Sequence, residues 1–168
     1  KLECNLSGAC SLTNDGDIAK CEIECSGASK FINNGNIEDG NVECSGASAV
    51  KLNGKGSRLD LEGSGACKIN TRDFIASDVI LELSGASTAS VYAEKSLKYS
   101  VARTSKLTYY GNAEPIDMYE SGNVVKGNTT IEHCLNTATI SSEYKNGGMF
   151  NGGIAAVVMN DFAICTIN

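Results

Sequence analysis

The sequence predicts an all-β fold, a β-solenoid in which one short unit is stacked on itself about seven times. Two observations predict it. The residues Ser-Gly-Ala, or a degraded copy of them, recur at a nearly constant step, and apolar and polar residues alternate around each copy. A period near twenty indicates a stacked repeat, and alternation is the period of a strand with one buried face. We therefore expect coils of about 19 residues whose equivalent strands pair in parallel and in register.

The repeated motif has five clear copies and two weaker ones, which start at Ala102 and Ser121. Neighbouring clear copies start 19, 19, 19 and 20 residues apart. Small residues let the chain bend sharply between strands, so the motif is predicted to be a structural corner with no chemistry of its own. The Ser and Gly of the five corners are Ser7, Gly8, Ser26, Gly27, Ser45, Gly46, Ser64, Gly65, Ser84 and Gly85.

Apolar columns on both sides of the motif define the expected core. The residue before each Ser is mostly apolar, and so is the residue five places after it, as Phe31 and Val50 illustrate. A third apolar position, eleven places after the Ser, is predicted from Ile18, Ile37 and Ile75. Each unit is thus expected to hold two or three short strands separated by tight corners.

Composition fits a narrow core and excludes some functions. The chain of 168 residues has 18 Gly, one Pro and no Trp, so its core must rely on aliphatic residues and Cys. A net charge of −6 argues against nucleic acid, because no basic stripe is available to neutralise phosphates. No apolar run is long enough to span a membrane. Because the chain opens inside a repeat at Lys1, we expect a mature or truncated fragment.

The repeat also carries a family resemblance. The run Leu-Glu-Leu-Ser-Gly-Ala-Ser at 81–87, together with 105–112 and 121–124, resembles the putative auto-transporter adhesin, head GIN domain family. The likeness covers residue 1 to about 127. It implies a single-stranded, right-handed parallel β-helix that is secreted or held at the cell surface, in a family found mainly in Bacteroidetes.

The tail departs from the repeat. Residues 1–127 form the expected β-helix of about seven coils, and residues 128–168 are a degenerate extension. The segments 130–136 and 151–155 are similar to GLUG-type repeats of bacterial surface proteins, although Ala156 stands where that motif has Gly. We expect this extension to continue or cap the solenoid.

Two of the eight cysteines, Cys25 and Cys44, fall in the same column of neighbouring coils. They would be stacked directly on one another, which makes them a candidate disulfide in an extracellular protein. The alternative is that they are small buried hydrophobic residues that stay reduced. No Cys-x-x-Cys pair or His–Cys cluster predicts a zinc site.

The strongest candidate for function is a carboxylate ladder two places before each Ser. Its members would lie about 4.8 Å apart on the outer side of successive strands. Such a row could bind Ca²⁺, which prefers several oxygen ligands, or act as paired acids on a polysaccharide. It could also be a solvated face that prevents aggregation. The members are Glu24, Glu43, Glu62 and Glu82.

We expect a non-enzyme: a cell-surface or secreted module for adhesion or scaffolding through an extended face. The Ser of the motif recurs too often to be one activated nucleophile, and the single histidine, His133, lies in the tail. The expected partners are a surface glycan or a protein, with a homo-oligomer also open, and no cofactor beyond the calcium considered above. The alternative is a carbohydrate-binding or carbohydrate-active β-helix that uses the stacked carboxylates.

Overall fold

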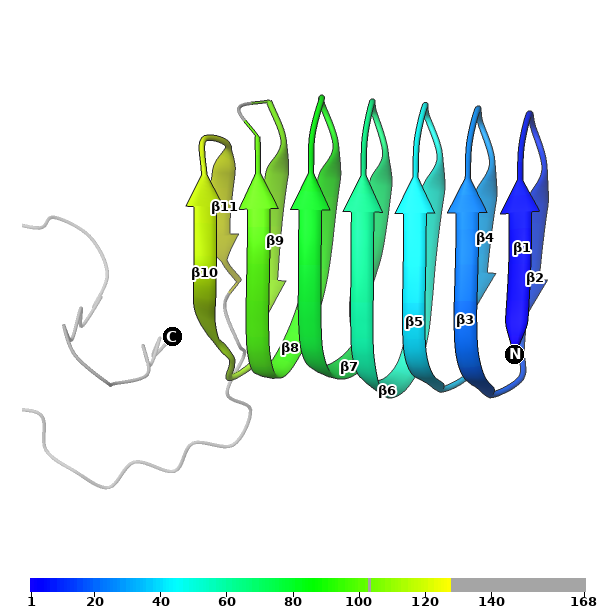
Figure 1. Ribbon diagram of the computed structural model, residues 1–168, viewed down its shortest axis with the longest axis horizontal. Helices are drawn as coiled ribbons and strands as arrows, with labels where there is room; N and C mark the ends of the chain where they lie inside the picture. The colour runs from blue at the N-terminus through cyan, green and yellow to red at the C-terminus, as the bar shows by residue number, and fades with distance from the viewer. Residues whose placement is uncertain (103, 128–168) are drawn as a thin grey trace, which may run out of the picture. The chain divides into compact units, whose positions relative to one another are not determined.

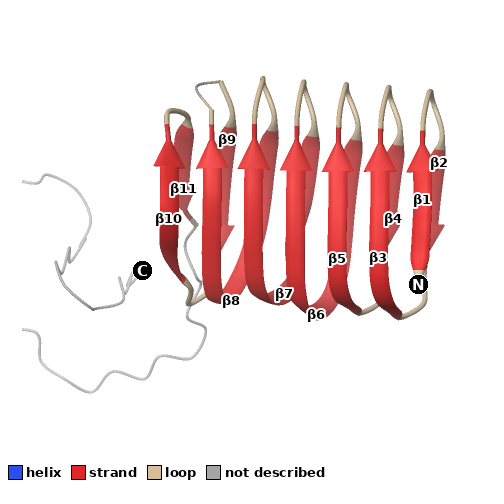
Figure 2. Cartoon of the chain, in the orientation of Figure 1, coloured by secondary structure: helices blue, strands red, loops and turns tan. Residues whose placement is uncertain are grey.

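The computed structural model describes residues 1–102 and 104–127, and these form a β-solenoid of about seven coils (Figure 1). Every regular element among the described residues is a strand, and all the strands belong to one sheet that winds around the core (Figure 2). The strands are β1 (Leu2–Leu6), β2 (Ser11–Asn14), β3 (Ile18–Cys25), β4 (Lys30–Asn33), β5 (Ile37–Cys44), β6 (Ala49–Gly63), β7 (Lys68–Leu83), β8 (Thr88–Val101), β9 (Lys106–Tyr110), β10 (Glu114–Glu120) and β11 (Asn123–Lys126).

The solenoid has two broad faces that lie back to back. The front face consists of β1, β3, β5, β10 and the C-terminal parts of β6, β7 and β8, whose arrows point upward on the side nearer the viewer in Figure 1. The back face consists of β2, β4, β9, β11 and the N-terminal parts of β6, β7 and β8. The three long strands pass from one face to the other because their coils keep pairing through the intervening bend.

All pairings are parallel and shifted by one coil, as the repeat predicts. Cys25, for example, pairs with Leu6 on one side and with Cys44 on the other. The predicted columns around the motif face inward, and Phe31 and Val50 are among the buried residues. Burial of this slim aliphatic core on successive coils is what stabilises the stack.

The Ser-Gly-Ala motif forms the predicted corner at the end of each front strand. The Gly adopts a left-handed conformation, with φ of 73° at Gly27 and 70° at Gly46, a region that disfavours side chains. Hydrogen bonds continue through the corner, because Ser26 N–H donates to the Leu6 carbonyl (2.8 Å) and Ala28 N–H to the Gly8 carbonyl (2.7 Å). The corner therefore stacks as regularly as the strands.

The small residue that enters the core at this corner is the one after the Ala. The Ala itself is exposed, whereas Ser29 and Ser48 are buried and their hydroxyls lie 3.4 Å apart. Ser48 also donates to the Ser45 carbonyl (2.7 Å). These buried hydroxyls are satisfied inside the corner, which explains why polar residues are tolerated there.

The prediction that Ile75 belongs to a third inward-facing apolar column is wrong. Its side chain is 47% exposed, and Phe74 is the fully buried residue of this corner. The cause is the 20-residue coil, whose extra residue shifts the register so that Gly54 pairs with Phe74 and Gly56 with Ala76. Gly56 leaves the space that the ring enters, since a Cβ there would lie 3.0 Å from Phe74 Cζ.

The predictions for residues 128–168, including the GLUG-like segments and His133, lie outside the described residues. Within residues 1–102 and 104–127, no helix is long and apolar enough to cross a membrane.

Candidate functional site

The predicted carboxylate ladder exists as a continuous exposed row on the front face. Glu24 pairs with Glu43, which pairs with Glu62, which in turn pairs with Glu82. All four side chains are exposed. Because adjacent parallel strands lie about 4.8 Å apart, this row sets four like charges at a short regular spacing.

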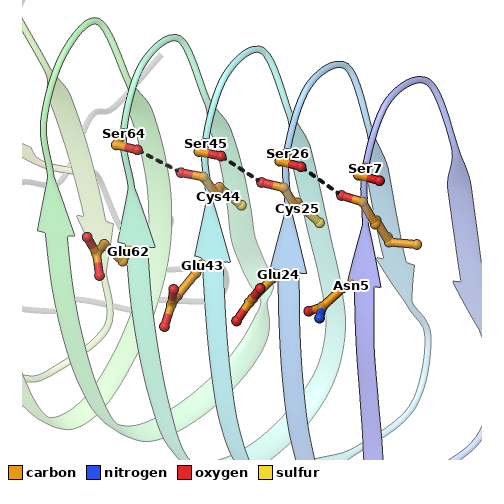
Figure 3. A pocket seen from close by; sticks show the side chains of 11 residues that line it. Asn5, Ser7, Glu24, Cys25, Ser26, Glu43, Cys44, Ser45, Glu62 and Ser64 are labelled. Carbon is orange, nitrogen blue, oxygen red and sulfur yellow. Dashed lines mark hydrogen bonds between the residues drawn. The ribbon is translucent and has the colours of Figure 1, made fainter.

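A shallow groove of about 170 Å³ runs between this Glu row and the serines of the corners. Figure 3 shows the carboxylates on one side of the groove and the serine hydroxyls on the other. The hydroxyls of Ser26, Ser45 and Ser64 each donate to a carbonyl of the preceding coil at 3.4 Å, so these hydrogen bonds are long and weak. The groove thus presents acceptors along one wall and hydroxyls along the other.

A second acidic column on the same face, formed by Glu3, Glu22 and Asp60, is neutralised by basic side chains that contact it. Lys1 contacts Glu22 (2.9 Å), and Lys20 contacts it as well (2.9 Å). The hydrogen bond from Lys1, with that from Lys20 next, holds the pKa of Glu22 below its usual value. Further along, Arg58 contacts Asp60 (3.3 Å).

The Glu row differs from this column because it has no such partners. Among the described residues, none of its four carboxylates forms an ion pair. Nor do three His, Cys, Asp or Glu side chains in this part of the chain converge as a metal site would require. The row is an extended charged surface, in which each carboxylate faces solvent beside its neighbours.

The back face carries the opposite charge. Its strands, in residues 11–14, 30–33, 49–52, 68–71, 88–92, 106–110 and 123–126, contain no Asp or Glu. Lys30 and Lys68 each pair with Ala49, so they recur on every second coil, and Lys106 follows two coils later. Lys51 lies on the coil between the first two. These four lysines are exposed and form no ion pair with the described residues.

This separation of charge was only half visible in the sequence. Lysines recur four places after the start of the motif, at Lys30, Lys68 and Lys106, but this column alone gives no reason to expect that acidic residues avoid the whole face. The signal lies in the alternation of residues along each unit. The outward positions before the Ser are rich in Glu and Asp, whereas the positions four and six places after it contain no acidic residue and are mostly Lys, Ser, Thr and Asn.

Cys25 and Cys44 are stacked as predicted, in register on adjacent strands. Both are free thiols and are almost completely buried, at 2% and 3% exposure. The hydrogen bond to Cys25 raises the pKa of the Cys44 thiol, and burial acts in the same direction. The disulfide remains a prediction, and burial makes both thiols poorly accessible to reagents in solvent.

Comparison with protein families gives a match over residues 1–113 to the putative auto-transporter adhesin, head GIN domain. The chain belongs to this family, as its repeat suggested. Neither the curated proteins nor the solved structures compared with the chain gave a match.

Proposed function

We propose that this chain is a non-enzymatic module of the cell surface or of a secreted protein, which acts in adhesion or scaffolding through an extended face. The observation that carries the proposal is the front face, where an exposed row of carboxylates without ion pairs runs along four coils beside a shallow groove. Membership of an adhesin-like family supports the surface location.

The geometry of the groove favours binding over catalysis. General acid–base work needs carboxylates in different environments, one of them with a raised pKa. Here the carboxylates are equivalent by repetition, exposed, and spread along a line with no enclosed pocket around any one of them. A repeated shallow surface suits an extended ligand that is held by many weak contacts.

The test is a binding screen with the purified full chain, immobilised and exposed to a glycan array and to a panel of extracellular-matrix proteins. We expect retention of at least one ligand class without release of cleaved product. The Glu43→Gln, Glu62→Gln double variant should weaken that retention several-fold. The matched control is Glu94→Gln, which removes one exposed carboxylate at the opposite corner of a coil.

Turnover of any glycan in a reducing-sugar assay would contradict the non-enzymatic proposal. If the double variant and the wild type retain the ligand equally, the Glu row is not the binding surface. Failure to bind any ligand in both panels would overturn adhesion altogether.

A further inference from the structure

We propose that copies of this chain stack laterally, with the acidic front face of one copy against the basic back face of the next. The partner is thus a second copy of the same chain. This inference does not depend on the proposed function, because it concerns the attraction between the front face of one copy and the back face of another, without any foreign ligand.

The first observation is that the front face keeps a surplus of free negative charge. Its strands contain only three positive residues, and each contacts a carboxylate on the same face: Lys20 contacts Glu22, Arg58 contacts Asp60, and Lys98 contacts Asp117 (2.9 Å). Within the described chain, the Glu row is left without a counter-charge.

The second observation is the complementary surplus on the back face. Five exposed lysines stand there with no acidic residue in the surrounding strands. Lys126 contacts Glu114 of β10 (3.4 Å), and the other four have no ion pair with the described residues. The Glu row and the unpaired lysines therefore both lack a counter-charge within the molecule, and the face of a second copy could supply it. Charged rows of opposite sign steer two surfaces together and fix their relative register.

The third observation is that the two rows share one repeat length. Each step along the Glu row and each step along the back-face strands is one coil, about 4.8 Å. Lys30 and Lys68 are two coils apart, as are Glu24 and Glu62. When two copies lie with parallel or antiparallel axes, a match at one coil is repeated at the next, because the pitch is the same in both.

The shapes of the faces permit this contact. Both are flat parallel sheets, and sheets pack face to face at about 10 Å. The groove beside the Glu row is open enough to receive a lysine ammonium between the carboxylates and the Ser hydroxyls (Figure 3). Since the front of one copy meets the back of another, the contact is heterologous and can extend into an open stack.

The experiment uses two charge-reversed forms of the full chain and sedimentation velocity over a range of concentrations. Glu43→Lys, Glu62→Lys places two positive charges in the middle of the Glu row, so that this part of the front face repels the back face. Lys51→Glu, Lys68→Glu places two negative charges in the middle of the back face, so that this part repels the Glu row. We expect the wild type to associate at high concentration, each variant alone to be at least tenfold weaker, and an equimolar mixture of the two variants to recover association.

The mixture is the decisive sample. The variants differ by four charge units in opposite directions from the wild-type net charge of −6, so both remain negative and global attraction cannot bring them together. Glu94→Lys and Lys95→Glu, at an exposed corner between the faces, are the matched controls and should associate as the wild type does. Circular dichroism verifies that each form is folded.

A mixture that stays monomeric overturns the proposal, as does association of either reversed variant alone at the wild-type level. Ligand binding by the immobilised chain is measured on isolated molecules, so loss of stacking and loss of ligand binding are separate results.

Discussion

A Cβ atom on Gly46 would lie 2.8 Å from the carbonyl oxygen of Gly27 on the coil before it. Contact at this distance does not occur between ordinary side chains and backbone, and Gly46 also has a φ of 70°. Two independent constraints, the backbone conformation and the close stacking of coils, therefore require glycine at the corner.

We expect Gly46→Ala to lower the free energy of unfolding by more than about 2 kcal/mol, since the left-handed conformation alone costs about 1–2 kcal/mol and the clash adds to it. Gly8→Ala is the control: its φ is 77°, but no atom lies within 4 Å of the added Cβ. It should show the conformational cost alone. If urea denaturation shows that the two variants lose the same unfolding free energy, the close contact between coils is not the reason that glycine is required at Gly46.

The corrected register at the 20-residue coil predicts unequal effects for adjacent residues. Phe74→Ala should cost about 3–5 kcal/mol of unfolding free energy, because it empties the core where Phe74 is fully buried. Ile75→Ala should cost less than about 1 kcal/mol, because the side chain is largely exposed. If Ile75 were instead the inward-facing residue, as a uniform 19-residue spacing predicts, Ile75→Ala would cost more unfolding free energy than Phe74→Ala.

How far the sequence could predict the structure is clear from this coil. Periodicity alone placed the corners, the inward columns and the Glu row, because each depends only on a residue's distance from the nearest Ser-Gly-Ala. It could not place Ile75, because an extra residue between Ser64 and Ser84 can be accommodated anywhere between them. The burial of Ser29 was also beyond it, since that depends on a hydrogen-bond partner in another coil.

Thr71 offers a stabilising substitution. Its hydroxyl is buried and has no hydrogen-bond partner within the described residues. Thr71→Val removes this unsatisfied group at nearly constant volume and should raise the unfolding free energy by about 1 kcal/mol. Thr13→Val, on an exposed position of β2, should have no measurable effect. A loss of stability in Thr71→Val would mean that an ordered water satisfies the hydroxyl.

The Glu row should destabilise the isolated fold slightly through repulsion between like charges. Glu43→Gln removes the charge that has carboxylates on both sides, and we expect a gain of a few tenths to about 1 kcal/mol. The gain should disappear in 1 M NaCl, where the Debye length is about 3 Å. Calcium at matched ionic strength should act no differently from sodium, and a Tm rise specific to calcium, lost in Glu43→Gln, would instead establish a cation site.

Thiol reactivity should follow burial. Cys4 and Cys10 are only partly buried, whereas Cys21 is fully buried and burial raises its thiol pKa to about 11. In a timed alkylation at pH 8 read by peptide mass spectrometry, Cys4 and Cys10 should be modified first, and Cys21, Cys25 and Cys44 only when the protein opens. A Cys25–Cys44 cross-linked peptide from the untreated native protein would show that the disulfide forms instead.

The corner of the longer coil, where Arg72 and Asp73 are exposed, shows where this architecture can change length. The extra residue there alters the local pairing, but by Asp78 the strands on the front face are again in step with their neighbours. Insertions at this bend should therefore be tolerated without disturbing either charged face. The same bend is a suitable position at which to graft a foreign peptide or attach a label, because both charged faces would stay intact.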